Sequence, residues 1–214
     1  MINDEERFIL MDACDDRCNH LKYFSTLNPA LPTDGSRWHA MHRIPVQDLS
    51  SQEAKDLSAD ILLNRLLPRL QRELPGVAEE MLENNDLANI GKTYKLECSG
   101  FEPGVNRYET GGAFEPHTDD FGITINILLS DEGAFNGGGT AFYTQKPGGE
   151  KALEPSVKVE PEPGCAVVFN GNVWHEGLPV EKGVRHLYVA CCIVPIVHAH
   201  VFFPCTPVCS SNPA

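Results

Sequence analysis

Three side chains in the second half of the sequence have the types and the order of a metal-binding set. His117 and Asp119 are separated by one residue, and in extended backbone two side chains at this spacing point to the same side. A second histidine, His175, follows an apolar run and a Gly-Asn turn. Two imidazoles and one carboxylate form the facial ligand set that leaves positions on Fe(II) open for other ligands. The sequence therefore predicts a metal site made by His117, Asp119 and His175.

An arginine strengthens this prediction, because a lone His-x-Asp pair also occurs by chance in proteins without a metal. Arg185 follows His175 at the edge of the β-like run 186–194. A guanidinium can bind a carboxylate through two parallel hydrogen bonds. It would then fix the far end of a dicarboxylate whose keto-acid end chelates the metal. The alternative is an arginine at a solvated strand end, which has no connection with the histidine spacing.

A helical segment is expected before these residues. Ser50 and Glu53 have the spacing of a capping box, and apolar residues follow at helical intervals. Pro68 is expected to kink this helix. The expected helices run from Ser50 to Pro75 and from Val77 to about Asn84. Residues 1–50 contain several Pro and Gly residues and are expected to be irregular.

From Thr93 onward the sequence changes to short β-like runs between Gly and Pro turns. The expected strands are Thr93–Phe101, Val105–Tyr108, Ile123–Leu129, Thr140–Tyr143, Val157–Val159, Cys165–Asn170 and His186–Val194. Strands at this spacing are typical of a sandwich or jelly roll. We therefore expect an N-terminal helical support over residues 1–92, a β-core over 93–200 and a tail over 201–214.

The composition and charge argue against some partners. The chain has 214 residues and a formal net charge of −13, and acidic residues occur in both halves. An acidic protein repels phosphate backbones and anionic lipid, so neither nucleic acid nor a membrane is expected as a partner. No run reaches the ~18 apolar residues of a membrane span. The N-terminal residues lack the features of a signal peptide, which predicts a cytoplasmic protein with reduced thiols.

Two further motifs have alternative interpretations. The pairs Cys14-x3-Cys18 and Cys205-x3-Cys209 could together hold zinc, but their spacing is looser than that of common zinc knuckles. Residues 137–139 are three consecutive glycines. They are interpreted as a turn, because no helix follows to bind phosphate and no Lys-Ser/Thr is present.

The segment 106–194 resembles the prolyl and lysyl hydroxylase branch of the 2-oxoglutarate/Fe(II) dioxygenases. Its first part, residues 108–119, reads YETGGAFEPHTD and is similar to the prolyl 4-hydroxylase pattern of Tyr, paired Gly, an aromatic residue and His-x-Asp. Three later segments look closer to lysyl hydroxylases, and these are residues 123–130, 135–140 and 175–185. Each piece is weak by itself, but their ordered combination is specific.

The resemblance implies a mainly β fold with N-terminal helices, namely a double-stranded β-helix of the jelly-roll, cupin-like kind. It also implies that His117, Asp119 and His175 bind Fe(II) and that Arg185 binds the distal carboxylate of 2-oxoglutarate. Tyr108 falls on a family position that contacts this co-substrate.

One position departs from the family pattern. Prolyl hydroxylases often carry Tyr on the strand after His-x-Asp, where this chain has Leu128. Asn126 alternates onto the same face as Leu128, which makes it a candidate for the missing co-substrate contact. Phe114 and Trp174 are candidates for the substrate entrance, although aromatic residues also pack in cores and at rims.

The activity implied by the resemblance is hydroxylation of an unactivated C–H bond, coupled to oxidative decarboxylation of 2-oxoglutarate to succinate. O₂ is the second co-substrate, and ascorbate is expected as an accessory reductant. The expected substrate is a peptidyl prolyl or lysyl residue, while a free amino acid or other small molecule stays open. A non-catalytic β-helix binding module and another metalloenzyme on a jelly roll are the competing classes. Neither of them needs the dicarboxylate site that Arg185 and Tyr108 suggest.

Overall fold

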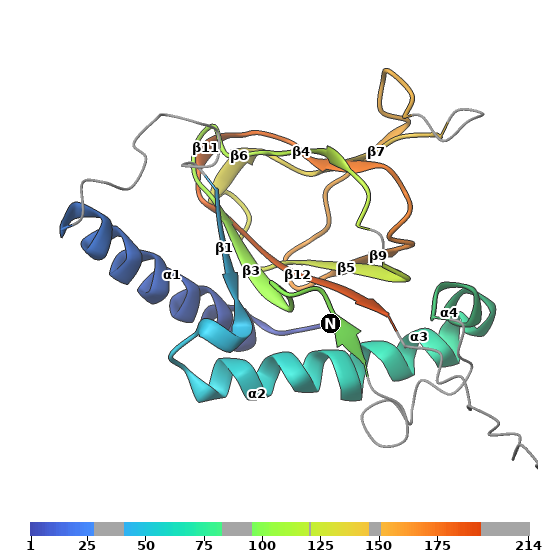
Figure 1. Cartoon of the computed structure of the whole chain (residues 1–214), viewed down its shortest axis with the longest axis horizontal. Coiled ribbons are helices and arrows are strands. Elements are labelled where there is room, and N and C mark those ends of the chain that lie inside the picture. The colour runs from blue at the N-terminus through green and yellow to red at the C-terminus, as the bar shows by residue number, and fades with distance from the viewer. Residues whose placement is uncertain (28–40, 83–95, 120, 146–150, 194–214) are drawn as a thin grey trace, which may run out of the picture.

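The fold combines a layer of helices with two facing antiparallel sheets (Figure 1). A computed structural model describes residues 1–27, 41–82, 96–119, 121–145 and 151–193. The helices are α1 (Asp4–Leu27), η2 (Val46–Asp48), α2 (Gln52–Asp60), the π-helix η3 (Ile61–Leu66), α3 (Leu67–Glu73) and α4 (Pro75–Leu82). The strands are β1 (Met41–Pro45), β2 (Glu97–Cys98), β3 (Gly104–Tyr108), β4 (Phe114–His117), β5 (Ile123–Leu128), β6 (Phe135–Gly137), β7 (Thr140–Phe142), β8 (Val157–Val159), β9 (Ala166–Phe169), β10 (His175–Gly177), β11 (Val180–Gly183) and β12 (Arg185–Ile193).

The larger sheet has the order β1-β3-β12-β5-β9, and β2 pairs with the end of β12. The smaller sheet has the order β4-β10-β7-β8, while β11 and β6 form a separate pair. All of these pairings are antiparallel. Two such sheets facing each other form a double-stranded β-helix, so the expected mainly β fold with N-terminal helices is confirmed.

The central strands of the larger sheet bury both of their faces. On β5, Ile123, Ile125 and Ile127 belong to the hydrophobic cluster shared with the helices, whereas Thr124 and Asn126 face the space between the sheets. β12 alternates in the same way, with Tyr188, Ala190 and Cys192 toward the helices and Arg185, Leu187 and Val189 toward the interior. The two-residue period of a strand therefore separates the apolar core from the polar interior.

Residues 1–50 are not irregular as expected, because they contain α1 and β1. Asn3 and Glu6 cap α1 reciprocally, since each backbone N–H donates to the other side chain. Leu10, Cys14 and Cys18 follow at intervals of four residues and are buried. This capping pair and this spacing could have predicted the helix from the sequence. β1 depends on pairing with β3, which no local pattern reveals.

The next helical segment differs in detail from the expectation. Its N-cap is Ser51 and not Ser50, because the Ser51 hydroxyl accepts a hydrogen bond from the Ala54 N–H, three residues on. Pro68 lies at the start of α3, directly after the six-residue π-helix η3. The Leu67 N–H bonds to the Leu62 carbonyl five residues back, so a π turn precedes the proline.

The expected strands of the β-core coincide with β3, β5, β7, β8, β9 and β12, within a few residues at each end. The expected strand Thr93–Phe101 is reduced to β2, and residues 93–95 lie outside the described residues. The sequence did not reveal β4, β6, β10 and β11, which have three or four residues each. Strands this short have too few residues to show a periodic pattern.

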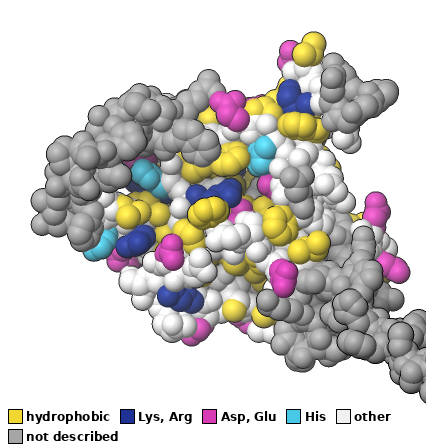
Figure 2. Space-filling model, viewed as in Figure 1, with side chains coloured by type: hydrophobic (Ala, Val, Ile, Leu, Met, Phe, Trp, Pro, Cys, Tyr) yellow, Lys and Arg dark blue, Asp and Glu magenta, His cyan; other side chains and the backbone are white. Residues whose placement is uncertain are grey.

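Acidic side chains are scattered over the face shown in Figure 2 and are not gathered in one patch there. Among the described residues, no helix has the length and apolar character needed to cross a membrane. Cys14 and Cys18 are both buried in α1, while Cys205 and Cys209 lie outside the described residues.

Candidate functional site

The two sheets bring His117, Asp119 and His175 together. His117 ends β4, His175 begins β10, and the two residues are direct partners in the antiparallel ladder. Their ring centroids lie 4.3 Å apart. Asp119 follows β4 by two residues, and its backbone N–H donates to the Gly171 carbonyl. One ligand atom from each of the three residues lies within 4.8 Å of the others, and this is the only such group found among the described residues.

Both imidazoles are oriented by the backbone. The Nδ1 of His117 lies 2.8 Å from the Glu115 carbonyl oxygen, and the Nδ1 of His175 lies 2.9 Å from that of Val173. A carbonyl only accepts, so each Nδ1 carries the proton and donates it. Each Nε2 then presents its lone pair toward Asp119, at 3.2 Å for His117 and 3.3 Å for His175. This is the tautomer that a metal-binding histidine needs.

The ionisation states of the group also suit a cation. Burial lowers the pKa of His175, which favours the neutral imidazole. Burial alone would raise the pKa of Asp119, but the hydrogen bond from Thr124 and the nearby imidazoles of His117 and His175 hold it below its ordinary value. A neutral imidazole and a charged carboxylate are the forms in which these side chains bind metals.

Arg185 begins β12 and is only 1% exposed. Among the described residues, its Nη1 has no hydrogen-bond partner. Its guanidinium carbon lies 5.5 Å from the centre of the Tyr108 ring, which offers a weak cation–π contact. A buried guanidinium nitrogen without an acceptor is costly, because it has lost its hydration and gained no hydrogen bond in return. The geometry therefore suits an anionic ligand beside Arg185.

A single small cavity, which we name the inner cavity, connects Arg185 with the metal-ligand candidates. It has a volume of about 30 Å³ and its lining includes Tyr108, His117, Asp119, Asn126, His175 and Arg185. All six predicted site residues thus meet in one place. This volume is about that of one water molecule, so the walls must separate before a five-carbon diacid can enter.

Tyr108 and Asn126 line the inner cavity from β3 and β5, the two strands that flank β12 in the larger sheet. Tyr108 is opposite Arg185 in the ladder between β3 and β12. Asn126 is 6% exposed, and among the described residues its Oδ1 has no hydrogen-bond partner. Leu128 does not line this cavity but borders a different pocket. Of the two aromatic candidates, Phe114 lines the inner cavity, whereas Trp174 is not among its lining residues.

Sequence reasoning missed a hydrogen-bonded chain that leads to Tyr108. The buried Glu102 carboxylate pairs with Arg43 Nη1 at 2.9 Å, and Arg43 Nε donates to Asn106 Oδ1 at 3.0 Å. Asn106 Nδ2 in turn donates to the Tyr108 hydroxyl oxygen at 3.1 Å. Because this oxygen accepts from Asn106, its own proton is available for another acceptor. Arg43 comes from β1, so no sequence spacing connected it with the site.

The glycine turn between β6 and β7 lies against Arg185. Gly137, Gly138 and Gly139 all have positive φ angles, in agreement with the expected turn. A Cβ at Gly138 would lie 3.1 Å from Cδ of Arg185 and 3.3 Å from the Phe135 ring. The turn therefore limits the positions that the Arg185 side chain can take.

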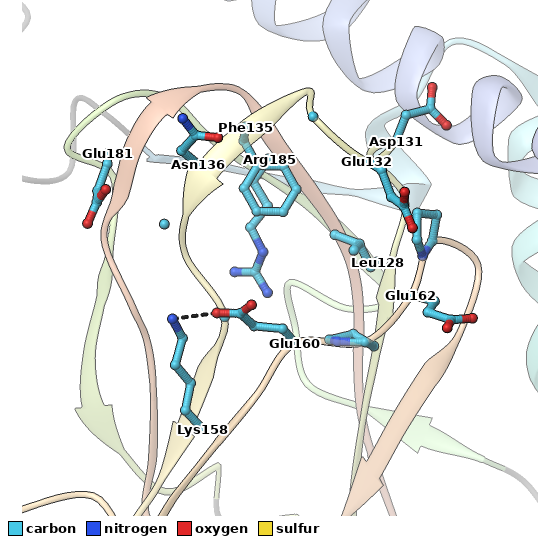
Figure 3. Close-up of a pocket in the computed structure, with 15 residues that line it drawn as sticks. Leu128, Asp131, Glu132, Phe135, Asn136, Lys158, Glu160, Glu162, Glu181 and Arg185 are labelled. Carbon is cyan, nitrogen blue, oxygen red and sulfur yellow. Dashed lines mark ion pairs between the residues drawn. The ribbon is translucent and has the colours of Figure 1, made fainter.

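A second pocket of about 580 Å³, which we name the outer pocket, also has Arg185 in its lining, and Figure 3 shows the Arg185 guanidinium pointing toward Glu160 there. Carboxylates are prominent in its lining, and they are Asp131, Glu132, Glu160, Glu162 and Glu181. Lys158 forms an ion pair with Glu160 there. Like charges repel, so a dianion is disfavoured at the mouth of this pocket.

The residues that are present fit an Fe(II) ion and a dicarboxylate. Two neutral imidazoles and a carboxylate are a suitable donor set for Fe(II). The unpartnered Arg185 Nη1 and the available Tyr108 proton suit a carboxylate in the same cavity.

Comparisons with known proteins agree with this fold. Residues 103–191 match the family described as the 2OG-Fe(II) oxygenase superfamily. A PKHD-type hydroxylase from Delftia acidovorans is 26% identical over 157 residues, which cover 69% of this chain and 67% of that protein. The crystal structure of a Pseudomonas putida prolyl-4-hydroxylase has a TM-score of 0.50 at 20% identity, and the match covers 89% of this chain and 87% of that one.

The matched segment contains all six residues that line the inner cavity from the predicted set. Proteins of this family are oxygenases that use Fe(II) and 2-oxoglutarate. Over residues 103–191 the chain is similar in sequence to the 2OG-Fe(II) oxygenase superfamily, and its fold is similar to that of a prolyl-4-hydroxylase.

Proposed function

We propose that this oxygenase binds Fe(II) through His117, Asp119 and His175 and hydroxylates an unactivated C–H bond of a peptidyl prolyl or lysyl residue. The observation that carries the site assignment is the buried Arg185. Its Nη1 lacks a partner among the described residues, and it shares the inner cavity with a cluster of metal-type ligands. A competing metalloenzyme or binding module would have no use for a buried guanidinium nitrogen without an acceptor at this place.

The three ligands are prepared for a cation before it arrives. The backbone carbonyls of Glu115 and Val173 fix the two histidine tautomers. Thr124 donates its hydroxyl proton to Asp119 Oδ2 and so restrains the carboxylate. Orientation of metal ligands by such outer hydrogen bonds strengthens metal binding.

Arg185, Tyr108 and Asn126 are proposed to bind 2-oxoglutarate. Arg185 provides the charge for the distal carboxylate, and Tyr108 donates its hydroxyl proton while Asn106 holds its oxygen. Asn126 offers an amide at the cavity wall, and exchanging its oxygen and nitrogen positions would place a donor where Oδ1 now stands. Fe(II), 2-oxoglutarate and O₂ together supply the oxidising chemistry, in which the oxo acid becomes succinate.

The side chains of this chain then position the substrate and exclude water. Phe114 and Arg43 line the inner cavity, and the Arg43 guanidinium lies 5.2 Å from the centre of the Phe114 ring. Because these side chains are held partly by one another, we propose that they separate when ligands enter. Ascorbate is proposed as an accessory reductant.

Binding experiments without turnover test the site. Under anaerobic conditions, titration calorimetry should show Fe(II) binding by the wild type and then binding of 2-oxoglutarate. His117→Ala and His175→Ala should lose the first step. Arg185→Ala should retain Fe(II) but lose about 2–5 kcal/mol of affinity for 2-oxoglutarate. Arg69→Ala, on an exposed helix surface, is the matched control. Wild-type affinity for 2-oxoglutarate in Arg185→Ala would contradict the proposed anchor.

The substrate assignment rests on the motif resemblance and needs a separate test. The loaded enzyme is incubated with prolyl- and lysyl-containing peptide libraries and, in parallel, with free amino acids. The expected product is a peptide heavier by one oxygen atom, formed together with succinate. Turnover on free amino acids alone would contradict the peptidyl assignment and leave the oxygenase intact. Failure to form succinate with any substrate would favour a binding module.

A further inference from the structure

Two cysteines face each other across the end of the larger sheet. Cys98 of β2 and Cys192 of β12 are direct partners in the antiparallel ladder. The Ser99 N–H donates to the Cys191 carbonyl at 3.1 Å, while the Cys191 N–H donates to the Glu102 carboxylate, so Ser99 and Cys191 occupy a hydrogen-bonded position with one of its two ladder bonds. Hydrogen-bonded and non-hydrogen-bonded pairs alternate along such a ladder. Cys98 and Cys192 are therefore a non-hydrogen-bonded pair, the type whose side chains are closer.

The geometry of this pair suits a disulfide. Cα atoms in a non-hydrogen-bonded pair lie about 4.5 Å apart, within the ~4.4–6.8 Å range that disulfides span. Both side chains lie on the helix-facing side of the sheet, since Cys192 belongs to that hydrophobic cluster and Cys98 packs against it.

We propose that Cys98 and Cys192 are a modification site, at which hydrogen peroxide joins them in a reversible cross-strand disulfide. Peroxide first oxidises the Cys98 thiol to a sulfenic acid and releases water. The Cys192 sulfur then attacks the Cys98 sulfur, forms the S–S bond and expels a second water. Two thiols and one peroxide thus give one disulfide and two waters. Thiol reductants reverse the reaction.

The surroundings assign different roles to the two thiols. Cys98 is partly exposed and meets the oxidant, whereas Cys192 is fully buried. The neighbouring Cys98 and burial together raise the pKa of the Cys192 thiol. A buried thiol of this kind is inert by itself and reacts when a sulfenic acid forms beside it. The site is independent of the proposed metal centre, because both side chains lie on the opposite face of the sheet from the inner cavity.

Other cysteines provide alternatives that the experiment must separate. Cys14 and Cys18 lie one turn apart on α1, but both are buried and neither is open to the oxidant. Cys165 is exposed and has no cysteine opposite it in the described ladders. It is therefore the matched control for oxidation without a partner.

The test treats the metal-free full chain with hydrogen peroxide in the presence of a chelator. Free thiols are then alkylated, and peptides are mapped by mass spectrometry without reduction. Wild type should give linked peptides containing Cys98 and Cys192, with a mass two hydrogen atoms below that of the two reduced peptides. Dithiothreitol should restore both thiols. Cys165→Ser should behave as wild type, whereas Cys98→Ser and Cys192→Ser should form no such link.

The disulfide should also be visible in stability, because it would close a loop from residue 98 to residue 192. Oxidation should raise the apparent Tm of wild type and of Cys165→Ser by about 5 °C or more. It should leave the Tm of Cys98→Ser unchanged. Linkage of Cys14 to Cys18, linkage of Cys98 to any other cysteine, or overoxidation of Cys98 without linkage would overturn the proposal.

Discussion

At the residue scale, hydrogen bonds orient the metal-ligand candidates and leave the Nε2 atom of each histidine available to bind a metal. Both histidines donate Nδ1–H to a carbonyl two residues earlier, at Glu115 and Val173. Asp119 accepts from Thr124, a side chain on the interior face of β5. These contacts remove rotational freedom before any ligand binds, which reduces the entropy cost of binding.

Thr124 gives the first prediction at this scale. Thr124→Val removes the hydroxyl that donates to Asp119 and keeps a similar shape, so Fe(II) affinity should fall about 10- to 100-fold. Anaerobic titration calorimetry measures the effect. Thr124→Ser keeps the hydroxyl and should remain near wild type. If the valine variant bound Fe(II) as tightly as wild type, the hydrogen bond would have no role in the site.

At the element scale, the turn between β6 and β7 packs against the Arg185 side chain and limits its position. Gly138 has a φ of +72° and lies where any Cβ would press on the arginine side chain. Gly133, in the preceding turn, has a similar φ of +79° but no atom within 4 Å of its would-be Cβ. A comparison of substitutions at these two glycines therefore distinguishes the effect of backbone strain from the effect of a Cβ that contacts Arg185.

Alanine at these two positions should have different effects. Both variants should lose about 1–2 kcal/mol of stability, because L residues are strained at positive φ. Only Gly138→Ala should also raise the KM for 2-oxoglutarate, by several fold, since it displaces Arg185. Urea unfolding and succinate assays measure the two effects. An equal KM increase in Gly133→Ala would mean that strain alone disturbs the site.

Hydrogen bonds between polar side chains join helix α1 to the larger sheet. Asp15 accepts hydrogen bonds from Arg107 on β3 and from His186 on β12. Burial alone would raise the pKa of Asp15, but these hydrogen bonds and charges hold it below its ordinary value. A lowered carboxyl pKa in the folded state means that folding favours the charged form.

Asp15→Asn should therefore lower the free energy of unfolding at neutral pH, and this loss should shrink at acidic pH. The stabilisation is present above the unfolded-state pKa of about 3.9 and disappears as the pH falls through the lower folded-state pKa. Because Asp15 is partly exposed, its loss should cost only about 1 kcal/mol at pH 7. Chemical denaturation of wild type and variant between pH 7 and pH 3 measures the difference. Asp16→Asn, exposed on the same helix, is the control, and a pH-independent difference would contradict the argument.

At the scale of the whole molecule, helices and sheet share one core. Ile123, Ile125 and Ile127 are fully buried in the cluster that includes Leu10 of α1 and Leu67 of α3. Burying a residue of this size contributes about 1.5–3 kcal/mol. The region 1–92 also supplies β1 to the larger sheet. The division into a helical support, a β-core and a tail therefore stays a prediction about sequence regions and not about separately stable units.

A fragment that begins at residue 93 tests this interdependence. Without the helices, the apolar face of β5 and β12 would be exposed to water, and β3 would lose its partner β1. The fragment should show no cooperative thermal unfolding, and its NMR amide signals should be poorly dispersed. The full chain is the reference. A fragment that unfolds cooperatively would show that the β-core is an independent domain.

Several features followed from the sequence alone, because they depend on local chemistry. The His-x-Asp spacing brings two ligands into one cavity, and the alternation after Ile123 separates an apolar face from a polar one. The buried helix face from Ala54 to Leu70 follows from helical spacing in the same way. These patterns repeat within a few residues, so no distant partner is needed to recognise them.

Only the tertiary structure decided the rest, because it depends on which strands lie side by side. Pairing of β4 with β10 places His175 opposite His117, and pairing of β3 with β12 places Tyr108 opposite Arg185. The lack of a hydrogen-bond partner for Arg185 Nη1 among the described residues and the contact of Arg43 from β1 with Asn106 are likewise consequences of packing. Burial, strand register and hydrogen-bond partners depend on segments that are distant in the sequence and close in space, so no local sequence pattern predicts them.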